Sequence, residues 1–247
     1  AAATDQGGTA VNSATFFDAI RPAFGGKLDA GQVQGLEILL TATDGLPASH
    51  RAYLLATAKH ETAHTMQPVR ETLAKSDDGA VKALEKAWKA GKLPWVKTPY
   101  WRKDRDGKSW FGRGYVQLTH KANYQKASAR TGIDLVADPS AALSPMVAAR
   151  ILVQGSSEGW FTGKSLSDYL PGDYVNARRV INGTDKAREI AKLAQTFEAT
   201  ITAAELVPPV RPDVVPVPPK SDPQAFGLAW LIKTIIAGLA LLFRRRK

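Results

Sequence analysis

Apolar residues recur at helical spacing through most of the first 206 positions, which predicts a mainly helical domain. Capping residues at the start of each pattern, and glycine or proline at its end, set the expected bounds. The predicted helices cover 14–24, a segment after Asp29, 47–63, 76–90, 121–131, 145–154, 174–181 and 185–206.

Residues 101–119 interrupt this helical pattern. They contain several aromatic residues, three glycines and a short alternation of apolar and polar positions, which favours a small β-hairpin. The expected fold class is therefore mainly α of the α+β type: a helical lobe with a small β-hairpin sheet, followed by a single C-terminal hydrophobic helix. Such folds often place their site between the sheet and the helical lobe.

The composition changes abruptly at residues 207–223, where seven of seventeen residues are proline. Because proline fixes φ and lacks an amide hydrogen, this stretch is predicted to be an extended linker, reaching roughly 50 Å at ~3.1 Å per residue. The sequence thus divides into a domain over 1–206, a linker over 207–223 and a C-terminal segment over 224–247.

Within the last segment, residues 226–243 form an apolar run broken only by Lys233 and Thr234. As a helix they would span ~27 Å, enough for the hydrocarbon core of a bilayer. The basic cluster 244–247 would stay cytoplasmic and place the domain on the other side of the membrane. Because Lys233 is unfavourable inside a bilayer, the alternative is a cationic helix that lies on the membrane or disrupts it.

Charge and composition narrow the choice of partners. The formal net charge is +10, and the segment from 207 onward carries half of it. This excess favours a polyanionic partner, but the dispersed basic residues and the lack of a recognised module argue against nucleic acid. The absence of cysteine excludes disulfides, thiolate metal sites and cysteine nucleophiles. The first 24 residues lack a basic start and a continuous apolar run, so no secretory signal is predicted there.

The sharpest short motif is the HExxH sequence from His60 to His64. In zinc peptidases, two histidines at this helical spacing bind the metal and the intervening glutamate, here Glu61, activates water. Glu85 has a suitable spacing for the third ligand. One interpretation is therefore a zinc peptidase acting on cell-wall peptides; the other is that the histidines have no ligand role.

A longer series of motifs supports a different interpretation. In order along the chain these are His60-Glu61-Thr62, Arg70-Glu71, Gly112-Arg113-Gly114-Tyr115-Val116-Gln117-Leu118-Thr119, Asn123-Tyr124 and Ile181-Asn182-Gly183. The series resembles glycoside hydrolase family 19, which includes chitinases and the chitinase-like lysozymes of bacteriophage endolysins. The resemblance covers approximately residues 50–200 and implies a lysozyme-like fold and a glycosidase that needs no cofactor.

The resemblance also implies roles for individual residues. Glu61 matches the general acid, and Glu71 matches the second carboxylate of the shorter bacterial and phage members. Gln117 and Thr119 match hairpin positions that hold the substrate and the attacking water. The other residues implied to bind substrate are His60, Asn123, Tyr124, Asn182 and Arg188.

Aromatic residues near the predicted hairpin are candidates for stacking on sugar rings: Tyr100, Trp101, Trp110 and Tyr115. Trp88 and Trp95 are interpreted instead as packing residues, since aromatic side chains mostly bury area.

The sequence departs from the family pattern in several places. Ala63 and His64 replace small or glycine residues, Thr119 stands where chitinases have serine, and Thr184 replaces a glycine. Glu71 follows Glu61 by only ten residues, closer than in plant chitinases, which leaves its role as the base open.

Glycoside cleavage requires a protonated carboxyl at the leaving oxygen and a second group that delivers water. Glu61 ends an otherwise apolar helix, where desolvation would favour the protonated form, whereas Glu71 follows Pro68 on a loop and is expected to stay ionised. Since family 19 enzymes invert, the resemblance implies carboxyl groups roughly 6.5–9.5 Å apart.

These features together predict a monomeric endolysin-type muramidase that cleaves the β-1,4 bond of peptidoglycan for host lysis. A basic domain with a membrane-directed tail suits the anionic envelope of a Gram-negative host, whereas chitin is neutral. The enzyme would be held at the inner membrane and face the periplasm. The alternatives are a chitinase, a lytic transglycosylase, the zinc peptidase, and a wall-binding or membrane-disrupting module without catalysis.

The tail hypothesis makes a direct prediction. Deletion of residues 207–247 should move the protein from the membrane fraction to the supernatant while activity on isolated cell wall persists, because only the apolar run 226–243 is expected to hold the membrane. Fractionation of the full and truncated chains measures this, and full retention of the truncated chain in the membrane would refute the anchor.

Overall fold

The computed structural model describes residues 11–207. The α-helices in this part are α1 (Ser13–Ile20), α2 (Ala30–Ala42), α3 (Ala48–Glu61), α4 (Asp77–Lys89), α5 (Lys121–Thr131), α6 (Pro145–Ser157) and α7 (Ala187–Glu205). Short 3-10 helices are η1 (Arg21–Phe24), η2 (Glu71–Leu73), η3 (Pro139–Leu143), η4 (Leu166–Asp168) and η5 (Asn176–Val180). A two-stranded sheet joins β1 (Val69–Arg70) and β2 (Arg113–Gly114). The predicted mainly α class with a small sheet is confirmed.

Capping side chains begin several of these helices, including the one expected after Asp29. Asn12 accepts a hydrogen bond from the amide of Thr15, and Asp29 forms a capping box with Gln32. The predicted helix over 14–24 is wrong at its end, because α1 stops at Ile20 and the chain tightens into η1 around Pro22. The segment predicted as a helix over 174–181 is likewise the short 3-10 helix η5.

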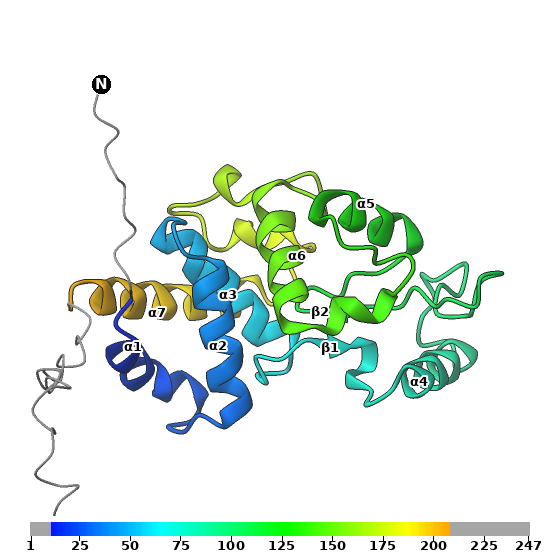
Figure 1. Ribbon diagram of the computed structural model, residues 1–247, viewed down its shortest axis with the longest axis horizontal. Helices are drawn as coiled ribbons and strands as arrows, with labels where there is room; N and C mark the ends of the chain where they lie inside the picture. The colour runs from blue at the N-terminus through cyan, green and yellow to red at the C-terminus, as the bar shows by residue number, and fades with distance from the viewer. Residues whose placement is uncertain (1–10, 208–247) are drawn as a thin grey trace, which may run out of the picture. The chain divides into compact units, whose positions relative to one another are not determined.

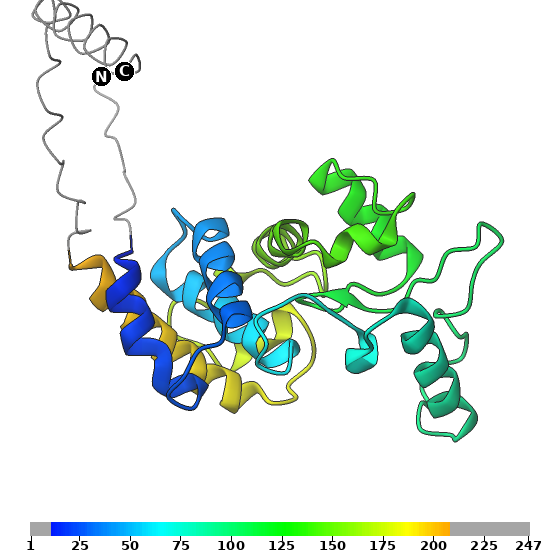
Figure 2. The ribbon, with the colours of Figure 1, turned by 60° about the horizontal axis from the view of Figure 1, so that its bottom comes forward.

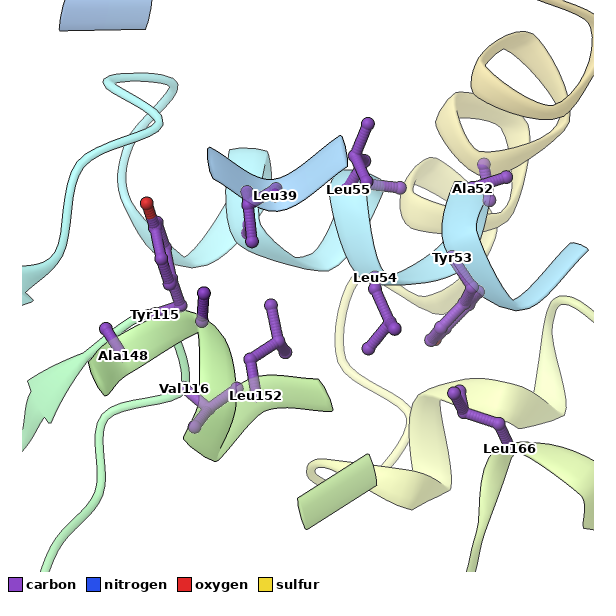
Figure 3. Packing of buried hydrophobic residues seen from close by; sticks show 14 of the residues in the cluster. Leu39, Ala52, Tyr53, Leu54, Leu55, Tyr115, Val116, Ala148, Leu152 and Leu166 are labelled. Carbon is purple, nitrogen blue, oxygen red and sulfur yellow. The ribbon is translucent and has the colours of Figure 1, made fainter. Parts of the chain in front are cut away.

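Helix α3 is the centre of the large lobe. Every residue from 49 to 59 is buried, and the helix packs along α7 and against α2 (Figures 1 and 2). Figure 3 shows Tyr53, Leu54 and Leu55 of α3 in the same cluster as Leu152 of α6 and Val116. A helix buried on all sides in this way has a fixed position, so the residue at its C-terminal end is held rigidly. That residue is Glu61.

A second, smaller core lies around α4, at the opposite end of the described chain from α1 in both ribbon views. Ala80 and Leu84 of α4 pack there with Trp101 and Phe111. Trp88 contributes its ring edge to Trp101 and donates a hydrogen bond from Nε1 to the carbonyl of Val96. The sheet lies between this small lobe and the large one (Figure 2).

The sheet differs from the predicted hairpin within 101–119. β2 pairs antiparallel with β1, Val69 opposite Gly114 and Arg70 opposite Arg113, whereas residues 113 and 118 form only an isolated bridge across a tight turn. The alternation of residue types marked the strand correctly, but its partner is more than forty residues earlier in the sequence.

The described residues contain no helix long and apolar enough to cross a membrane. The predicted spanning run 226–243 and nearly all of the predicted linker 207–223 lie outside the residues that the structure describes.

A close backbone contact joins α2 to the segment that leaves Glu61. Gly35 of α2 lies directly against Met66, so a β-carbon at Gly35 would stand 1.9 Å from the Met66 carbonyl oxygen. Met66 is fully buried and in turn accepts a hydrogen bond from the hydroxyl of Tyr115. Only glycine permits this approach, which fixes the segment between Glu61 and the sheet.

Replacement of Gly35 by alanine should therefore destabilise the protein by about 2–3 kcal/mol, because the added methyl group must displace backbone rather than a flexible side chain. Urea unfolding followed by circular dichroism measures the change. Gly31→Ala on the same helix is the matched control, since its nearest neighbours are 3.2 Å or more away, and should shift stability by less than about 1 kcal/mol. Equal effects of the two variants would contradict the contact.

Candidate active site

Glu61 lies at the end of α3 and is paired with a buried arginine. Arg178 of η5 donates a hydrogen bond from Nη1 to Glu61 Oε1 at 2.6 Å, and only 3% of the arginine side chain is exposed against 18% of the glutamate. Arg178 is itself held through its Nε, which donates to the carbonyl of Asp185. Within residues 11–207, Glu61 Oε2 accepts no hydrogen bond, so one oxygen of this rigidly placed carboxyl is available to a ligand.

The chain turns sharply after Glu61. Ala63, His64 and Met66 all have positive φ, the region that favours glycine. This conformation explains why small or glycine residues suit positions 63 and 64 in the family resemblance. Two contacts hold His64: its carbonyl accepts from Gln32 of α2, and its Nδ1 lies 2.9 Å from the ammonium of Lys59. Burial lowers the pKa of Lys59, and burial together with the nearby charges of Lys59 and His60 lowers that of His64.

Glu71 follows β1 directly and is held by neutral donors. The hydroxyl of Tyr100 donates to Oε1 at 2.7 Å, and the amide of Gly112 donates to Oε2 at 2.8 Å. The amide of Glu71 donates in return to the Gly112 carbonyl at 2.7 Å, so the backbone of the two segments is locked in register. Burial and the adjoining carboxylate raise the pKa of Tyr100, which keeps this phenol a donor.

Three of the predicted site residues meet at Gly112. A β-carbon there would lie 2.7 Å from Gln117 Oε1 and 3.2 Å from Thr119 Oγ1, so glycine lets both side chains pack over the backbone that binds Glu71. Thr119 donates its hydroxyl hydrogen to the Gln117 carbonyl at 2.6 Å, and its own carbonyl accepts from Asn123 at 2.8 Å. The structure thus brings together Glu71, Gln117, Thr119 and Asn123.

Asp77, Arg70 and Arg113 form a cluster of ion pairs, here called the charged frame, that supports the Glu71 side of the site. Asp77, at the start of α4, accepts from Arg70 of β1 at 2.6 Å and from Arg113 of β2 at 2.7 Å. Arg113 is only 2% exposed and also donates to the hydroxyl of Tyr124. Burial acts to raise the pKa of Asp77, but the hydrogen bonds and charges of the two arginines outweigh it and hold the pKa below its ordinary value.

Several of the predicted aromatic and cleft roles are wrong. Tyr115, Tyr124 and Trp101 are fully buried and Trp110 is 5% exposed, so their rings pack in the interior and do not face a sugar. Tyr115 and Tyr124 support the site instead, through their hydrogen bonds to Met66 and to the frame. The two tryptophans predicted to pack in the interior differ. Trp88 is a packing residue as predicted, whereas the prediction for Trp95 is wrong, because its side chain is 72% exposed.

The remaining predicted residues flank Glu61 and Arg178. His60 is partly exposed beside Glu61, while Asn182 and Arg188 are exposed on the segment between η5 and the first turn of α7. The amide of Asn182 donates to the carbonyl of Arg178, which ties this segment to the ion pair. Sequence analysis missed Arg178 itself, since nothing in the run Arg178-Arg179 marks which arginine is buried. It also missed the role of Tyr100 as a donor to Glu71.

Backbone strain gathers around the three predicted catalytic residues. Among the described non-glycine residues, positive φ occurs at Ala63, His64, Met66, Thr72, Leu73, Gln117, His120 and Lys186. All but Lys186 lie within five residues of Glu61, Glu71 or Thr119. Strain of this kind persists only where surrounding contacts over-determine the backbone, and it is typical of active sites.

The zinc interpretation of the HExxH motif is wrong. It requires His60 and His64 on one helical face, but α3 ends at Glu61 and His64 lies in the turn, bonded to Lys59. The expected third ligand, Glu85, is committed to Trp101 and Arg102, whose hydrogen bonds lower its pKa to about 2. Within residues 11–207 no three histidine or carboxylate side chains gather in a geometry that would hold a metal.

A cavity of about 530 Å³ adjoins the Glu71 side of the site. Residues 95–98, Thr119, His120 and the Tyr100 that binds Glu71 line it. The cavity therefore offers room for a ligand next to the second carboxylate.

Comparisons with known proteins identify a family and a similar fold. The family described as chitinase class I, glycoside hydrolase family 19, matches residues 40–165. Chitinase C from Streptomyces griseus HUT6037 is similar in fold, with a TM-score of 0.51 and 19% identity over 79% of this chain and 78% of that chain. A mutant of chitinase C (TM-score 0.44, 17% identity, 81% of this chain and 96% of that chain) and a bacterial family 19 chitinase (0.33, 19%, 75% and 95%) are more distant in structure. No curated protein sequence matches significantly.

The charged frame predicts a pH-dependent stability. At neutral pH, Asp77→Asn should destabilise the protein by about 1–2 kcal/mol, a value reduced for the solvent screening of this partly exposed carboxylate. Because the folded pKa is depressed, the contribution of Asp77 is present above its ordinary pKa of 3.8 and is lost as the pH falls through the lower folded value.

Urea unfolding at pH 7 and at a series of values below 4 would therefore show the wild type and Asp77→Asn converging in acid. Asp78→Asn is the matched control, since among the described residues its exposed carboxylate makes no ion pair. A constant difference between wild type and Asp77→Asn at all pH values would contradict the proposed linkage.

Proposed function

The chain belongs to glycoside hydrolase family 19, the class I chitinases, and is a glycoside hydrolase; we propose that its substrate is peptidoglycan and that it is an endolysin-type muramidase. The observation that carries the choice of substrate is the charge. The full chain has a net charge of +10, which favours an anionic wall polymer over neutral chitin by long-range attraction.

In the proposed reaction, Glu61 donates its proton from Oε2 to the leaving glycosidic oxygen. Arg178 engages the other oxygen and fixes the direction of the carboxyl group. As the bond breaks, positive charge develops on the sugar, and the carboxylate left on Glu61 is stabilised by the same guanidinium.

Glu71 acts as the base in this proposal. Each of its oxygens accepts one hydrogen bond from a neutral donor, Tyr100 or Gly112, which leaves a lone pair for a water molecule. Thr119 donates its hydrogen to the Gln117 carbonyl, so its hydroxyl oxygen can accept a hydrogen bond from that water. The proposal requires the water to attack from the face opposite Glu61, with carboxyl groups roughly 6.5–9.5 Å apart as for other inverting enzymes.

We further propose that residues 226–243 hold the enzyme at the inner membrane, with the proline-rich segment 207–223 giving the domain reach toward the wall. The support for this is the apolar run followed by the basic cluster 244–247 in the sequence.

The test is product analysis with two substitutions. Glu61→Gln should lower kcat by ~10²–10⁴-fold and Glu71→Gln by a similar order, because each removes a proton-transfer group while keeping the size of the side chain. Digestion of purified peptidoglycan followed by mass spectrometry should give new reducing N-acetylmuramic acid ends. Glu37→Gln, an exposed glutamate on α2, is the matched control and should retain full activity.

Other products would replace the proposal with a defined alternative. Reducing N-acetylglucosamine ends would move the cleaved bond, and cleavage of chitin alone would make the enzyme a chitinase. Anhydro-sugar ends that persist in Glu71→Gln would identify a lytic transglycosylase, which needs no second carboxylate. Intact glycan strands with cleaved peptides would overturn the assignment of Glu61 as the acid.

A further inference from the structure

An exposed aromatic residue lines the cavity beside Thr119. Trp95 lines the cavity and is 72% exposed, an unusual position for the residue type with the largest apolar surface. Local packing explains this orientation: Leu93 and Val96 turn toward the small core, and the Val96 carbonyl accepts from Trp88. Trp95 and Lys97, on either side of Val96, are left exposed. The backbone at Trp95 is therefore held in place, while the indole ring stays exposed.

The lining of the cavity includes one lysine, Lys97. Lys97 and His120 line it together with neutral residues, and no Asp or Glu from the described part of the chain is among the lining residues. Of the acidic groups near this segment, Glu71 accepts hydrogen bonds from Tyr100 and Gly112, while Glu85 pairs with Arg102 and Asp104 with Lys121. Lys97 itself forms no ion pair within residues 11–207, so it is available to an anionic ligand.

The cavity adjoins residues that take part in the proposed reaction. Thr119 is part of its lining, and so is Tyr100, which donates to Glu71. A glycan strand whose cleaved bond lies between the two carboxylates would extend into it on the Glu71 side. The indole ring of Trp95 and the ammonium of Lys97 could then contact the same ligand.

We propose that this cavity is a subsite for an N-acetylmuramoyl residue that carries its stem peptide: the sugar ring stacks on Trp95, and a carboxylate of the peptide pairs with Lys97. Chitin has the sugar ring but no carboxylate, so this subsite would distinguish the two polymers. The inference rests on the proposed action on peptidoglycan and adds the residues that select it.

The test compares two forms of one substrate with the full chain. Purified peptidoglycan is compared with the same material after an amidase has removed its peptides and the lactyl carboxylates that this exposes have been converted to neutral amides. Both forms are digested by wild type, Lys97→Glu and Trp95→Ala. Lys97→Glu should lower kcat/KM roughly fivefold on the peptide-bearing form, mainly through KM, and leave the stripped form unchanged. Trp95→Ala should lower it on the order of tenfold on both forms, since both contain the ring.

Lys92→Glu is the matched control, because it reverses an exposed charge in the same segment but does not line the cavity. Lys92→Glu should change kcat/KM by the same factor on both forms. This change should be smaller than the change that Lys97→Glu causes on the peptide-bearing form. Raising the salt concentration should also reduce the wild-type preference for the peptide-bearing form, since an exposed ion pair is screened.

Two results would overturn the subsite. Both assume that the wild type cleaves peptidoglycan. In the first, Lys97→Glu lowers kcat/KM equally on both forms, or lowers it on neither form. In the second, Trp95→Ala leaves kcat/KM unchanged. A wild type that cleaves chitin and neither form of peptidoglycan would instead refute the proposed function. The wild-type rate and the variant ratio thus test the two proposals separately.

Discussion

The eleven residues from Glu61 to Glu71 impose the main constraint on this structure. They connect the end of a fully buried helix to the sheet beside the small lobe, and they do so through Ala63, His64 and Met66 in left-handed conformations. Such a path is unfavourable by itself, so it must be over-determined by its surroundings. Gly35 and Tyr115 hold Met66 from two sides, and Gln32 holds His64. The relative position of the two carboxyl groups depends on these contacts.

The two carboxyl groups end in different environments, as a division between acid and base requires. Glu61 faces one buried cation, whose hydrogen bond fixes a single oxygen and leaves the other open. Glu71 accepts only neutral hydrogen bonds, one on each oxygen, beside an open cavity. In the proposed reaction, the first arrangement would set a direction for proton donation, and the second would hold a carboxylate where water has access. The contacts thus give two residues of the same type different surroundings.

Sequence patterns predicted those features that depend on local interactions. The starts of α1 and α2 follow from Asn12 and Asp29, whose side chains cap amides three residues away. The residues that pair between β1 and β2 are 43 and 45 positions apart, and Glu61 and Arg178 are 117 positions apart, so no local pattern contains these pairings. The HExxH motif misled for the same reason: its spacing assumes a helix through His64, whereas the tertiary contacts end α3 at Glu61. Burial of Tyr115 and exposure of Trp95 likewise follow from packing between segments.

The two cores place different parts of the proposed site. The large core around α3 places Glu61, and the charged frame of Asp77 and Arg113 places the strand that binds Glu71. The small core around α4 contributes no carboxyl group to the proposed reaction, but it anchors Val96 and so presents Trp95 and Lys97 to the cavity. Substitutions on this exposed segment would change the ligand without disturbing the strained connection between the carboxyl groups. In the proposed function, selection of an anionic substrate would therefore reside on this exposed segment, while the large core places Glu61 and groups of both lobes place Glu71.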